Sequence, residues 1–254
     1  MTDLSAFSLS GKTILVTGAN TGIGQGIALS IGRAGGTVIG VGRSHMDETA
    51  ALLAEAGAPF VGLHSDLASS AGAQAMFEAA WEANGPIDGL VNNAGMIRRV
   101  DVVDFSEDDW DQVMDVNLKT MFFLCQSMGR KALAAKRSAK IVNIASMLSF
   151  QGGIRVASYT ASKSGVLGIT RLLANEWAAQ GINVNAIAPG YIETNNTEAL
   201  RADTDRSAAI LGRIPAARWG APSDIGDAAV FLLSNAANYM HGAVIPVDGG
   251  WLAR

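Results

Sequence analysis

The stretch KTILVTGANTGIGQ, residues 12–25, joins an apolar run to a glycine-rich turn. Its first six residues predict a short buried strand, and a helix is expected to follow through Arg33. Gly18, Gly22 and Gly24 would let the backbone curl tightly and a ligand approach it, while the helix N-terminus offers N–H groups to a pyrophosphate. The spacing T-G-x-x-x-G-x-G is wider than the G-x-G-x-x-G fingerprint, but its place between a strand and a helix favours a dinucleotide site.

Strand-like and helix-like segments alternate along the rest of the chain. Further strands are predicted at 37–42, 59–64, 87–92, 140–146, 182–188 and 243–247. Helices are predicted at 48–56, 70–84, 105–124, 158–180 and 222–234. Because no linker, repeat or low-complexity tract interrupts this alternation, we expect one doubly wound α/β domain over residues 1–254.

The composition narrows the class of protein. Of 254 residues 49% are hydrophobic and 17% charged, which suits a parallel sheet buried on both faces. A net charge of -4 without a basic block gives no support to a nucleic-acid or membrane-surface role. The N-terminus MTDLSAFSLSGK lacks the pattern of a secretory signal, and no apolar run reaches the roughly 20 residues of a membrane span.

The single cysteine, Cys125, lies in the apolar segment TMFFLCQSM and has no partner for an internal disulfide. We predict a buried structural thiol rather than a nucleophile. With the missing secretory pattern, this indicates a reducing cytoplasm. No metal site is predicted either, because no second metal-type residue lies at ligand spacing from His64.

Tyr159 and Lys163 are four residues apart in a predicted helix, so both side chains project from one face. A free phenol titrates near 10, and a positive charge about 4 Å away is worth roughly 4 kcal/mol at an effective dielectric of about 20. Such a charge would lower the phenol's pKa by about three units and make Tyr159 a general acid or base. A surface helix also explains an isolated Y-x-x-x-K pattern, so the pattern needs its context.

That context is the predicted strand 140–146, KIVNIAS, which ends on Ser146. A serine at the end of a parallel strand stands at the carboxyl edge of the sheet, where ligands of open α/β sheets bind. The sequence therefore predicts that Ser146 and Tyr159 share one crevice.

Other strand ends should face the same crevice. Asp66 follows one strand, and the turn Asn92-Asn93-Ala94-Gly95 follows the next, where paired asparagine amides can tie strands together. Asn117 interrupts an apolar helical stretch, which indicates either a buried hydrogen bond or a kink. The turn Pro189-Gly190-Tyr191-Ile192 follows a later strand, and the arginine-rich region that ends at Gly220 reads as a lid over residues 191–220.

The residue after the second strand bears on cofactor choice. Proteins that bind a nucleotide without a 2′-phosphate usually carry an acid there, but this chain has Gly42 followed by Arg43. Arg43 would attract a 2′-phosphate, which favours NADP(H). The alternative is that Arg43 stacks on the adenine and accepts either NAD(H) or NADP(H).

Six motifs in this order, namely T-G-x-x-x-G-x-G, N-N-A-G, the helix asparagine, the strand-end serine, Y-x-x-x-K and P-G, resemble the short-chain dehydrogenase/reductase family over the whole chain. The resemblance implies a single-domain, Rossmann-type, doubly wound sheet of seven parallel strands flanked by helices. It also implies NAD(H) or NADP(H) as cofactor and usually a homotetramer.

The resemblance also implies roles for individual residues. Tyr159 would be the general acid/base, Lys163 would lower its pKa and bind the nicotinamide ribose, and Ser146 would polarise a substrate carbonyl. Asn117 would hold a water that links Lys163 to solvent. The cofactor would contact Gly18, Asn20, Thr21, Gly22, Ile23, Gly24, Arg43, Asp66, Leu67, Asn93, Ala94, Gly95, Tyr159, Lys163, Pro189, Gly190, Ile192 and Thr194.

A narrower resemblance covers the C-terminal two thirds of the chain. Segments such as FSEDDWDQVMDVNLKT, RIPAARWG and DGGWLAR are similar to the sugar-acid dehydrogenases of the family that act on 2-dehydro-3-deoxy-D-gluconate. A sugar-acid substrate needs a cation for its carboxylate, for which Arg98, Arg99 and Arg155 are candidates, although each also reads as a surface arginine. The predicted substrate contacts are Ser146, Tyr159, Arg98, Gln151, Arg155 and Tyr191.

Two alternatives stay open at this point. The enzyme would act on another carbonyl substrate, such as that of a gluconate 5-dehydrogenase or a 3-oxoacyl thioester reductase. Alternatively the chain would be a nucleotide-binding sensor without catalysis, which the presence of both Tyr159 and Lys163 disfavours.

Overall fold

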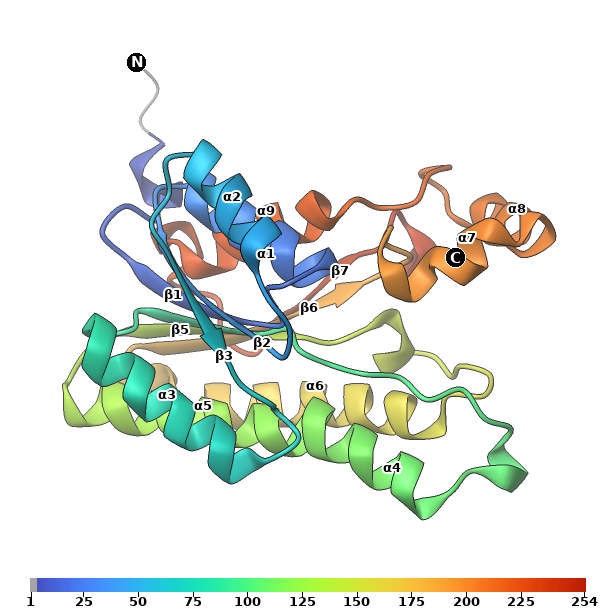
Figure 1. Cartoon of the computed structure of the whole chain (residues 1–254), viewed down its shortest axis with the longest axis horizontal. Helices are drawn as coiled ribbons and strands as arrows, with labels where there is room; N and C mark the ends of the chain where they lie inside the picture. Colours follow the sequence, from blue (N-terminus) through green and yellow to red (C-terminus); the bar gives the residue numbers. More distant parts are fainter. Residues whose placement is uncertain (1–3) are drawn as a thin grey trace.

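The computed structural model describes residues 4–254, which build one twisted sheet between two layers of helices (Figure 1). All strand pairs in the sheet are parallel, and the strand order is β3-β2-β1-β4-β5-β6-β7. The strands are β1 Thr13–Thr17, β2 Thr37–Gly42, β3 Phe60–His64, β4 Gly89–Asn92, β5 Ala139–Ile144, β6 Ile182–Pro189 and β7 Val244–Val247. This confirms the predicted fold class.

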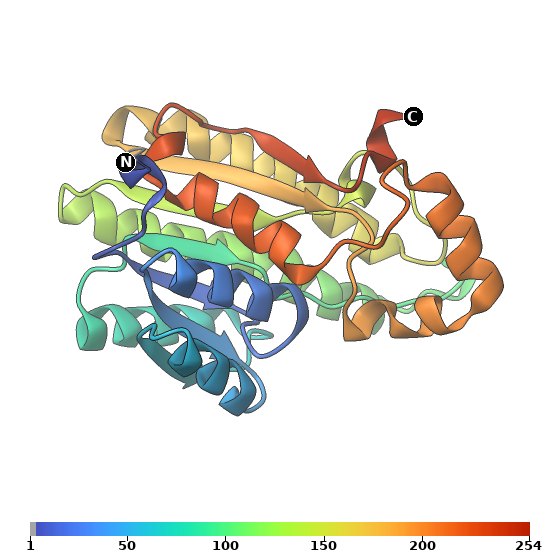
Figure 2. The ribbon, with the colours of Figure 1, turned by 90° about the horizontal axis from the view of Figure 1, so that it is seen from above.

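The helices divide between the two faces of the sheet. In Figure 1, α1, α2 and α9 lie on one face and α3 to α6 on the other. Their bounds are α1 Gly22–Arg33, α2 Asp47–Glu55, α3 Ser70–Asn84, α4 Glu107–Met114, α5 Met121–Ala134, α6 Ala157–Trp177, α7 Glu198–Ala202, α8 Thr204–Arg213 and α9 Pro222–Leu233. Short α7 and α8 stand apart from both layers, beyond the carboxyl ends of the strands (Figure 2).

Alternation along the strands explains why both faces are covered. In β1, Leu15 packs into the hydrophobic cluster beneath α3, α5 and α6, whereas Ile14 and Val16 pack into the cluster beneath α1 and α9. All three side chains are fully buried. Since successive strand residues point to opposite faces, a continuous apolar run makes a central strand with helices on both sides.

The strand order reverses beside β1, which pairs with β2 on one side and β4 on the other. Ligands of open α/β sheets bind at the carboxyl edge near such a reversal. The paired asparagines hold this edge as predicted: Asn92 Nδ2 donates to Asn143 Oδ1 at 2.9 Å, and Asn93 Nδ2 donates to the Thr17 carbonyl at 2.9 Å. Side-chain amides thus join β4 to β5 and β1 where the site begins.

Some predicted boundaries are wrong. The strand predicted at 140–146 ends at Ile144, because the chain turns into a short 3-10 helix at Met147, so Ser146 lies two residues beyond the strand. The helix predicted at 105–124 is instead α4, a π-helical segment Asp115–Thr120 and α5, which continues to Ala134.

Cys125 is fully buried, and burial raises the pKa of its thiol to about 12, in agreement with the predicted structural role. Its sulfur accepts a hydrogen bond from Asn92 Nδ2 at 3.2 Å. Within residues 4–254, no helix combines the length and the apolar character needed to cross a bilayer.

Candidate active site

A cleft of about 790 Å³ opens at the carboxyl edge of the sheet, between the strand ends and the segment that carries α7 and α8. It brings together most of the residues that the sequence singled out. Those that line it are Gly18, Asn20, Thr21, Gly22, Ile23, Gly24, Arg43, Asp66, Leu67, Asn93, Ala94, Gly95, Ser146, Gln151, Tyr159, Lys163, Pro189, Gly190, Tyr191, Ile192 and Thr194.

The glycine turn forms one end of the cleft. Gly18 and Gly22 have positive φ angles of 68° and 57°, which a side chain would strain. A Cβ on Gly24 would collide with the Gly18 carbonyl, so the close turn also excludes larger residues. The sequence places glycine where the backbone conformation requires it.

The first turn of α1 offers uncapped donors to the cleft. Thr21 makes no side-chain capping bond, and no acidic residue lies in this turn. By contrast, Ser69 caps α3 and Ser106 caps α4. An uncapped N-terminus that lines a cleft suits an anion such as a phosphate, so these residues fit the nucleotide that the glycine pattern predicts.

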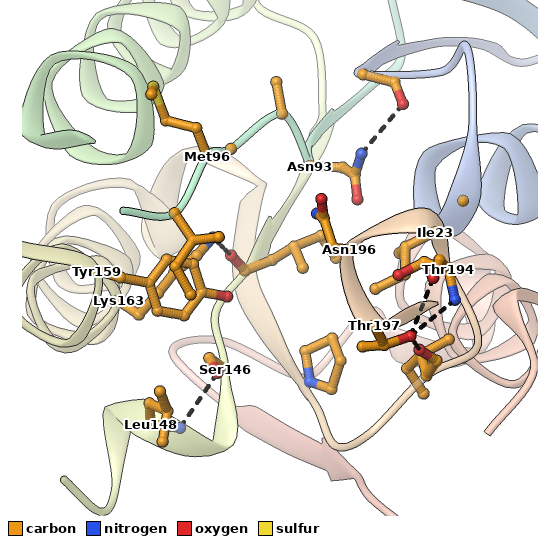
Figure 3. Close-up of a pocket in the computed structure, with 18 of the residues that line it drawn as sticks. Ile23, Asn93, Met96, Ser146, Leu148, Tyr159, Lys163, Thr194, Asn196 and Thr197 are labelled. Atoms are coloured by element: carbon orange, nitrogen blue, oxygen red, sulfur yellow. Dashed lines mark hydrogen bonds between the residues drawn. The ribbon is translucent and has the colours of Figure 1, made fainter. Parts of the chain in front are cut away.

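Lys163 and Tyr159 project from α6 into the middle of the cleft (Figure 3). Lys163 is 4% exposed; its Nζ donates to the Ile144 carbonyl at 2.7 Å and lies 5.7 Å from the centre of the Tyr159 ring. Burial lowers the pKa of Lys163 to about 8. At neutral pH Lys163 is therefore mostly protonated and positively charged.

The predicted fall in the pKa of Tyr159 is not observed. Burial raises the pKa of Tyr159, while the Ser146 hydroxyl and the charge of Arg99 oppose that rise. The prediction weighed only the attraction of a nearby lysine and left out the cost of removing the phenolate from water. The phenol is consequently protonated at neutral pH.

Ser146 stands beside the phenol and is 7% exposed. Its Oγ accepts a hydrogen bond from the Leu148 backbone at 3.2 Å and so caps the 3-10 turn after β5 (Figure 3). The capping bond fixes the position of a hydroxyl that still has its own proton to donate.

Asn117 lies behind this centre, outside the lining of the cleft. It is 2% exposed in the π-helical segment; its Oδ1 accepts from Met96 N at 2.8 Å, and its Nδ2 donates to Met96 O at 2.9 Å. Of the two predicted alternatives, the buried hydrogen bond is present, and the helix is π-helical at this position. Asn117 fixes the backbone just after Gly95.

Comparison with known proteins agrees with this geometry. Residues 18–252 match a family profile described as enoyl-(acyl carrier protein) reductase. The chain is 56% identical over 251 residues to the 2-dehydro-3-deoxy-D-gluconate 5-dehydrogenase of Escherichia coli K12, covering 99% of both chains. The chain belongs to the short-chain dehydrogenase/reductase family.

Two further relatives of the family cover almost the whole chain. The 2-dehydro-3-deoxy-D-gluconate 5-dehydrogenase of Bacillus subtilis is 52% identical over 252 residues, covering 98% of both chains. A crystal structure from Agrobacterium tumefaciens, described as a 2-deoxy-D-gluconate 3-dehydrogenase with bound NADP, is 60% identical, with a TM-score of 0.94 over 98% of this chain and 99% of that one.

Arg43 lines the cleft of this short-chain dehydrogenase/reductase at the end of β2. In the part of the chain that the structure describes, no salt bridge joins Arg43 to an acid. Ser44 accepts a hydrogen bond from Asn20 Nδ2 at 2.8 Å, which ties the residue after Arg43 to the glycine turn. Arg43 is thus held close to the uncapped N-terminus of α1.

Two predicted substrate contacts are not found in the cleft. Arg98 forms a salt bridge to Asp109 at 3.1 Å, and Arg155 forms one to Asp101 at 3.1 Å. Neither arginine lines the cleft, and each is paired with an acid that does not line it either. Arg99, the third candidate, does line it.

The lining also contains residues that sequence reasoning did not single out, among them Arg206 and Arg213 on α8 and Trp251 near the C-terminus. The two arginines are seven positions apart, a helical spacing that could have indicated a shared face. Among the described residues, no group of three or more His, Cys, Asp or Glu side chains is placed to hold a metal.

We predict that Lys163→Met stabilises the protein at pH 7. Burial depresses the pKa of Lys163 from 10.5 to about 8, which corresponds to about 3 kcal/mol of destabilisation below pH 8. The variant also loses the hydrogen bond to Ile144, which lowers its stability by about 1 kcal/mol. The net rise in the free energy of unfolding should therefore be about 2 kcal/mol. Between about pH 8 and 10.5 Lys163 is protonated in the unfolded wild type but not in the folded one, so the stability of the wild type rises with pH. The difference in stability between the variant and the wild type therefore disappears over this range.

Urea unfolding at pH 7 and pH 10 measures this difference. The matched control is Lys140→Met on β5, because burial also lowers the pKa of Lys140 to about 8 but Lys140 does not line the cleft. Turnover should be lost in the Lys163 variant and kept in the Lys140 variant. A Lys163→Met protein less stable than wild type at pH 7 would contradict the prediction.

Proposed function

We propose that this short-chain dehydrogenase/reductase interconverts a keto and a hydroxy group on a deoxy sugar acid, with NADP(H) as cofactor. The activity would be of the 2-dehydro-3-deoxy-D-gluconate 5-dehydrogenase type, as printed for the relative that is 56% identical. The observation that carries the proposal is the charge of the cleft. Among the described residues that line it, Asp66 is the only acid, whereas Arg43, Arg99, Lys163, Arg206 and Arg213 are cations.

The position of Asp66 supports an anionic substrate. Asp66 follows β3 and lies at the end of the sheet away from β5 and β6; its carboxylate accepts a hydrogen bond from Ala68 N at 3.0 Å. Around Tyr159 the charged side chains of the lining are therefore all basic. A cleft of one charge sign attracts ligands of the other, which suits a sugar carboxylate better than a neutral sugar.

The choice of NADP(H) rests on Arg43, and the relative with bound NADP supports it. When bound, the nicotinamide ring supplies or accepts the hydride. The glycine turn and the α1 N-terminus would bind the phosphates, and Arg43 the 2′-phosphate. The remaining proposed contacts are Asp66 and Leu67 to the adenine, Asn93, Ala94 and Gly95 to the ribose, and Pro189, Gly190, Ile192 and Thr194 to the carboxamide.

Tyr159 is the proposed proton donor in reduction, because burial keeps its phenol protonated at neutral pH. In oxidation the phenol must give up its proton, and the charges of Arg99 and Lys163 then stabilise the phenolate. Ser146 would donate its hydroxyl proton to the reacting substrate oxygen. Lys163 would also bind the nicotinamide ribose.

Asn117 is the proposed holder of a water that links Lys163 to solvent. Its Oδ1 accepts one hydrogen bond, from Met96 N, and a carbonyl oxygen can accept two. A Cβ on Gly95 would lie 3.2 Å from this Oδ1 and 3.7 Å from Lys163 Nζ, so the two polar atoms face one space that glycine leaves open. A water in that space would reach both.

Residues 191–220 form the proposed lid of the single domain. The segment begins at a turn fixed by Thr197, whose Oγ1 donates to the Ile192 carbonyl at 2.7 Å and accepts from Thr194 N at 3.1 Å (Figure 3). It returns to the sheet where Gly220 N donates to the Tyr191 carbonyl at 2.9 Å. Both ends are anchored, and α7 and α8 lie between them over the substrate end of the cleft.

A spectrophotometric screen tests the proposal. We expect NADP⁺ reduction with 2-dehydro-3-deoxy-D-gluconate to exceed that with D-gluconate, and NADPH oxidation by an acetoacetyl thioester to be weaker still. Tyr159→Phe should keep NADP(H) binding and lose turnover by about 10²–10⁴. A preference for the thioester would favour the rival reductase, cofactor binding without any turnover would favour the sensor, and near-wild-type turnover of Tyr159→Phe would contradict the proposed chemistry.

A cytoplasmic location and a homotetramer complete the proposal. Trp110 on α4, Leu133 on α5 and Leu172 on α6 are 39%, 41% and 46% exposed on helices that cover the same face of the sheet, so their apolar side chains are available for subunit contacts. Light scattering should give four times the chain mass of 26.3 kDa, and a monomer would contradict the tetramer. Cell fractionation tests the location, which the buried thiol of Cys125 supports.

A further inference from the structure

Two arginines of α8 face the cleft together. Arg206 and Arg213 are seven positions apart, so they lie on one side of the helix about two turns apart, and both line the cleft. Neither forms a salt bridge with an acid in the described part of the chain. Both side chains are exposed, so a solute can reach them.

An aromatic cluster holds Arg213 in place. Its guanidinium carbon lies 4.0 Å from the centre of the Trp251 ring, and Trp251 is only 5% exposed. Tyr191 packs edge-on against both Trp251, at 4.9 Å, and Trp219, at 5.4 Å. A guanidinium stacked on a fixed aromatic face keeps its edge N–H groups available and loses little freedom when it binds a carboxylate.

The lining offers little that would compete for this guanidinium. Gln151 Oε1 accepts from Arg213 Nη2 at 3.5 Å, a long and therefore weak bond. The nearby indole Nε1–H of Trp251 is buried without a hydrogen-bond partner in the described residues. This corner of the cleft thus holds an arginine with unused donors beside an unused neutral donor.

The arginines at the substrate end of the cleft lie near two different tyrosines. Arg99 acts on the pKa of Tyr159, so it lies near the reacting group. Arg206 and Arg213 instead act on Tyr191, where their charges oppose the rise in pKa that burial causes. A cation suited to a carboxylate several carbons from the reacting carbon is therefore available on α8, where both arginines line the cleft.

We propose that Arg213, assisted by Arg206, binds the carboxylate of the sugar acid, and that Trp251 is the positioning residue that orients Arg213. The inference rests on the proposed function, whose substrate class it explains. The carboxylate contact then comes from the lid, so substrates without the negative charge lose it. This assigns to α8 the role for which the sequence offered Arg98, Arg99 and Arg155 as candidates.

Calorimetric titration of the NADPH-loaded full-length protein with D-gluconate tests the inference, because gluconate has no keto group that NADPH could reduce. Arg213→Gln should weaken gluconate binding about tenfold, the low end for hydrogen bonds to a charged group. Binding of the uncharged probe D-gluconamide should not change. The matched control is Arg201→Gln, because Arg201 is a lid arginine that donates to the Thr194 carbonyl and does not line the cleft.

A second variant guards against a folding defect. Arg213→Lys keeps the charge without the planar fork and should bind gluconate between wild type and Arg213→Gln. Equal affinity of wild type and Arg213→Gln for gluconate would overturn the inference. Equal weakening of gluconate and gluconamide would also overturn it, because that result indicates a structural role, and so would a wild type that does not bind gluconate.

The activity screen separates this inference from the proposed function. If gluconate binding depends on Arg213 but no sugar acid is turned over, the proposed function fails and the carboxylate site stands. If sugar acids are turned over and Arg213→Gln leaves kcat/KM unchanged, the proposed function stands and the inference fails.

Discussion

The ammonium group of Lys163 is buried at the carboxyl end of β5, where its one hydrogen bond to the described residues goes to the Ile144 carbonyl. No salt bridge gives it an acid within the described residues. A cation removed from water without a counter-charge destabilises the folded chain, as its lowered pKa of about 8 records. This unfavourable burial places a positive charge close to Tyr159.

Several separate elements keep that charge in place. The Asn92 and Asn143 amides join β4 to β5, and Thr170 on α6 accepts from Asn143 Nδ2 at 3.0 Å, so one buried network links the strand to the helix that carries Lys163. Ser149 Oγ donates to the Lys163 carbonyl at 2.7 Å and ties the turn after β5 to the same helix. The active centre is thus rigid because its supports are buried hydrogen bonds, which are costly to break.

Much of this arrangement could be predicted from the sequence. The glycine turn, the strand ends and the pair Tyr159 and Lys163 follow from local patterns, since period, spacing and turn residues act over a few positions. The direction of the pKa shift of Tyr159 could not be predicted, because it depends on how deeply the phenol is buried. Which arginines line the cleft could not be predicted for a related reason. The acids that pair with Arg98 and Arg155 become partners only in the folded chain. Trp251, which contacts Arg213, is distant from it in sequence.

The buried charge can be measured directly by carbon NMR of the lysine side chains. The chain has six lysines, and the signal absent from a Lys163→Met spectrum identifies Lys163. A pH titration should give this signal a midpoint near 8, well below the ordinary 10.5. A midpoint at or above 10.5 would mean that the ammonium is solvated or paired with an acid, and would contradict the account of the site.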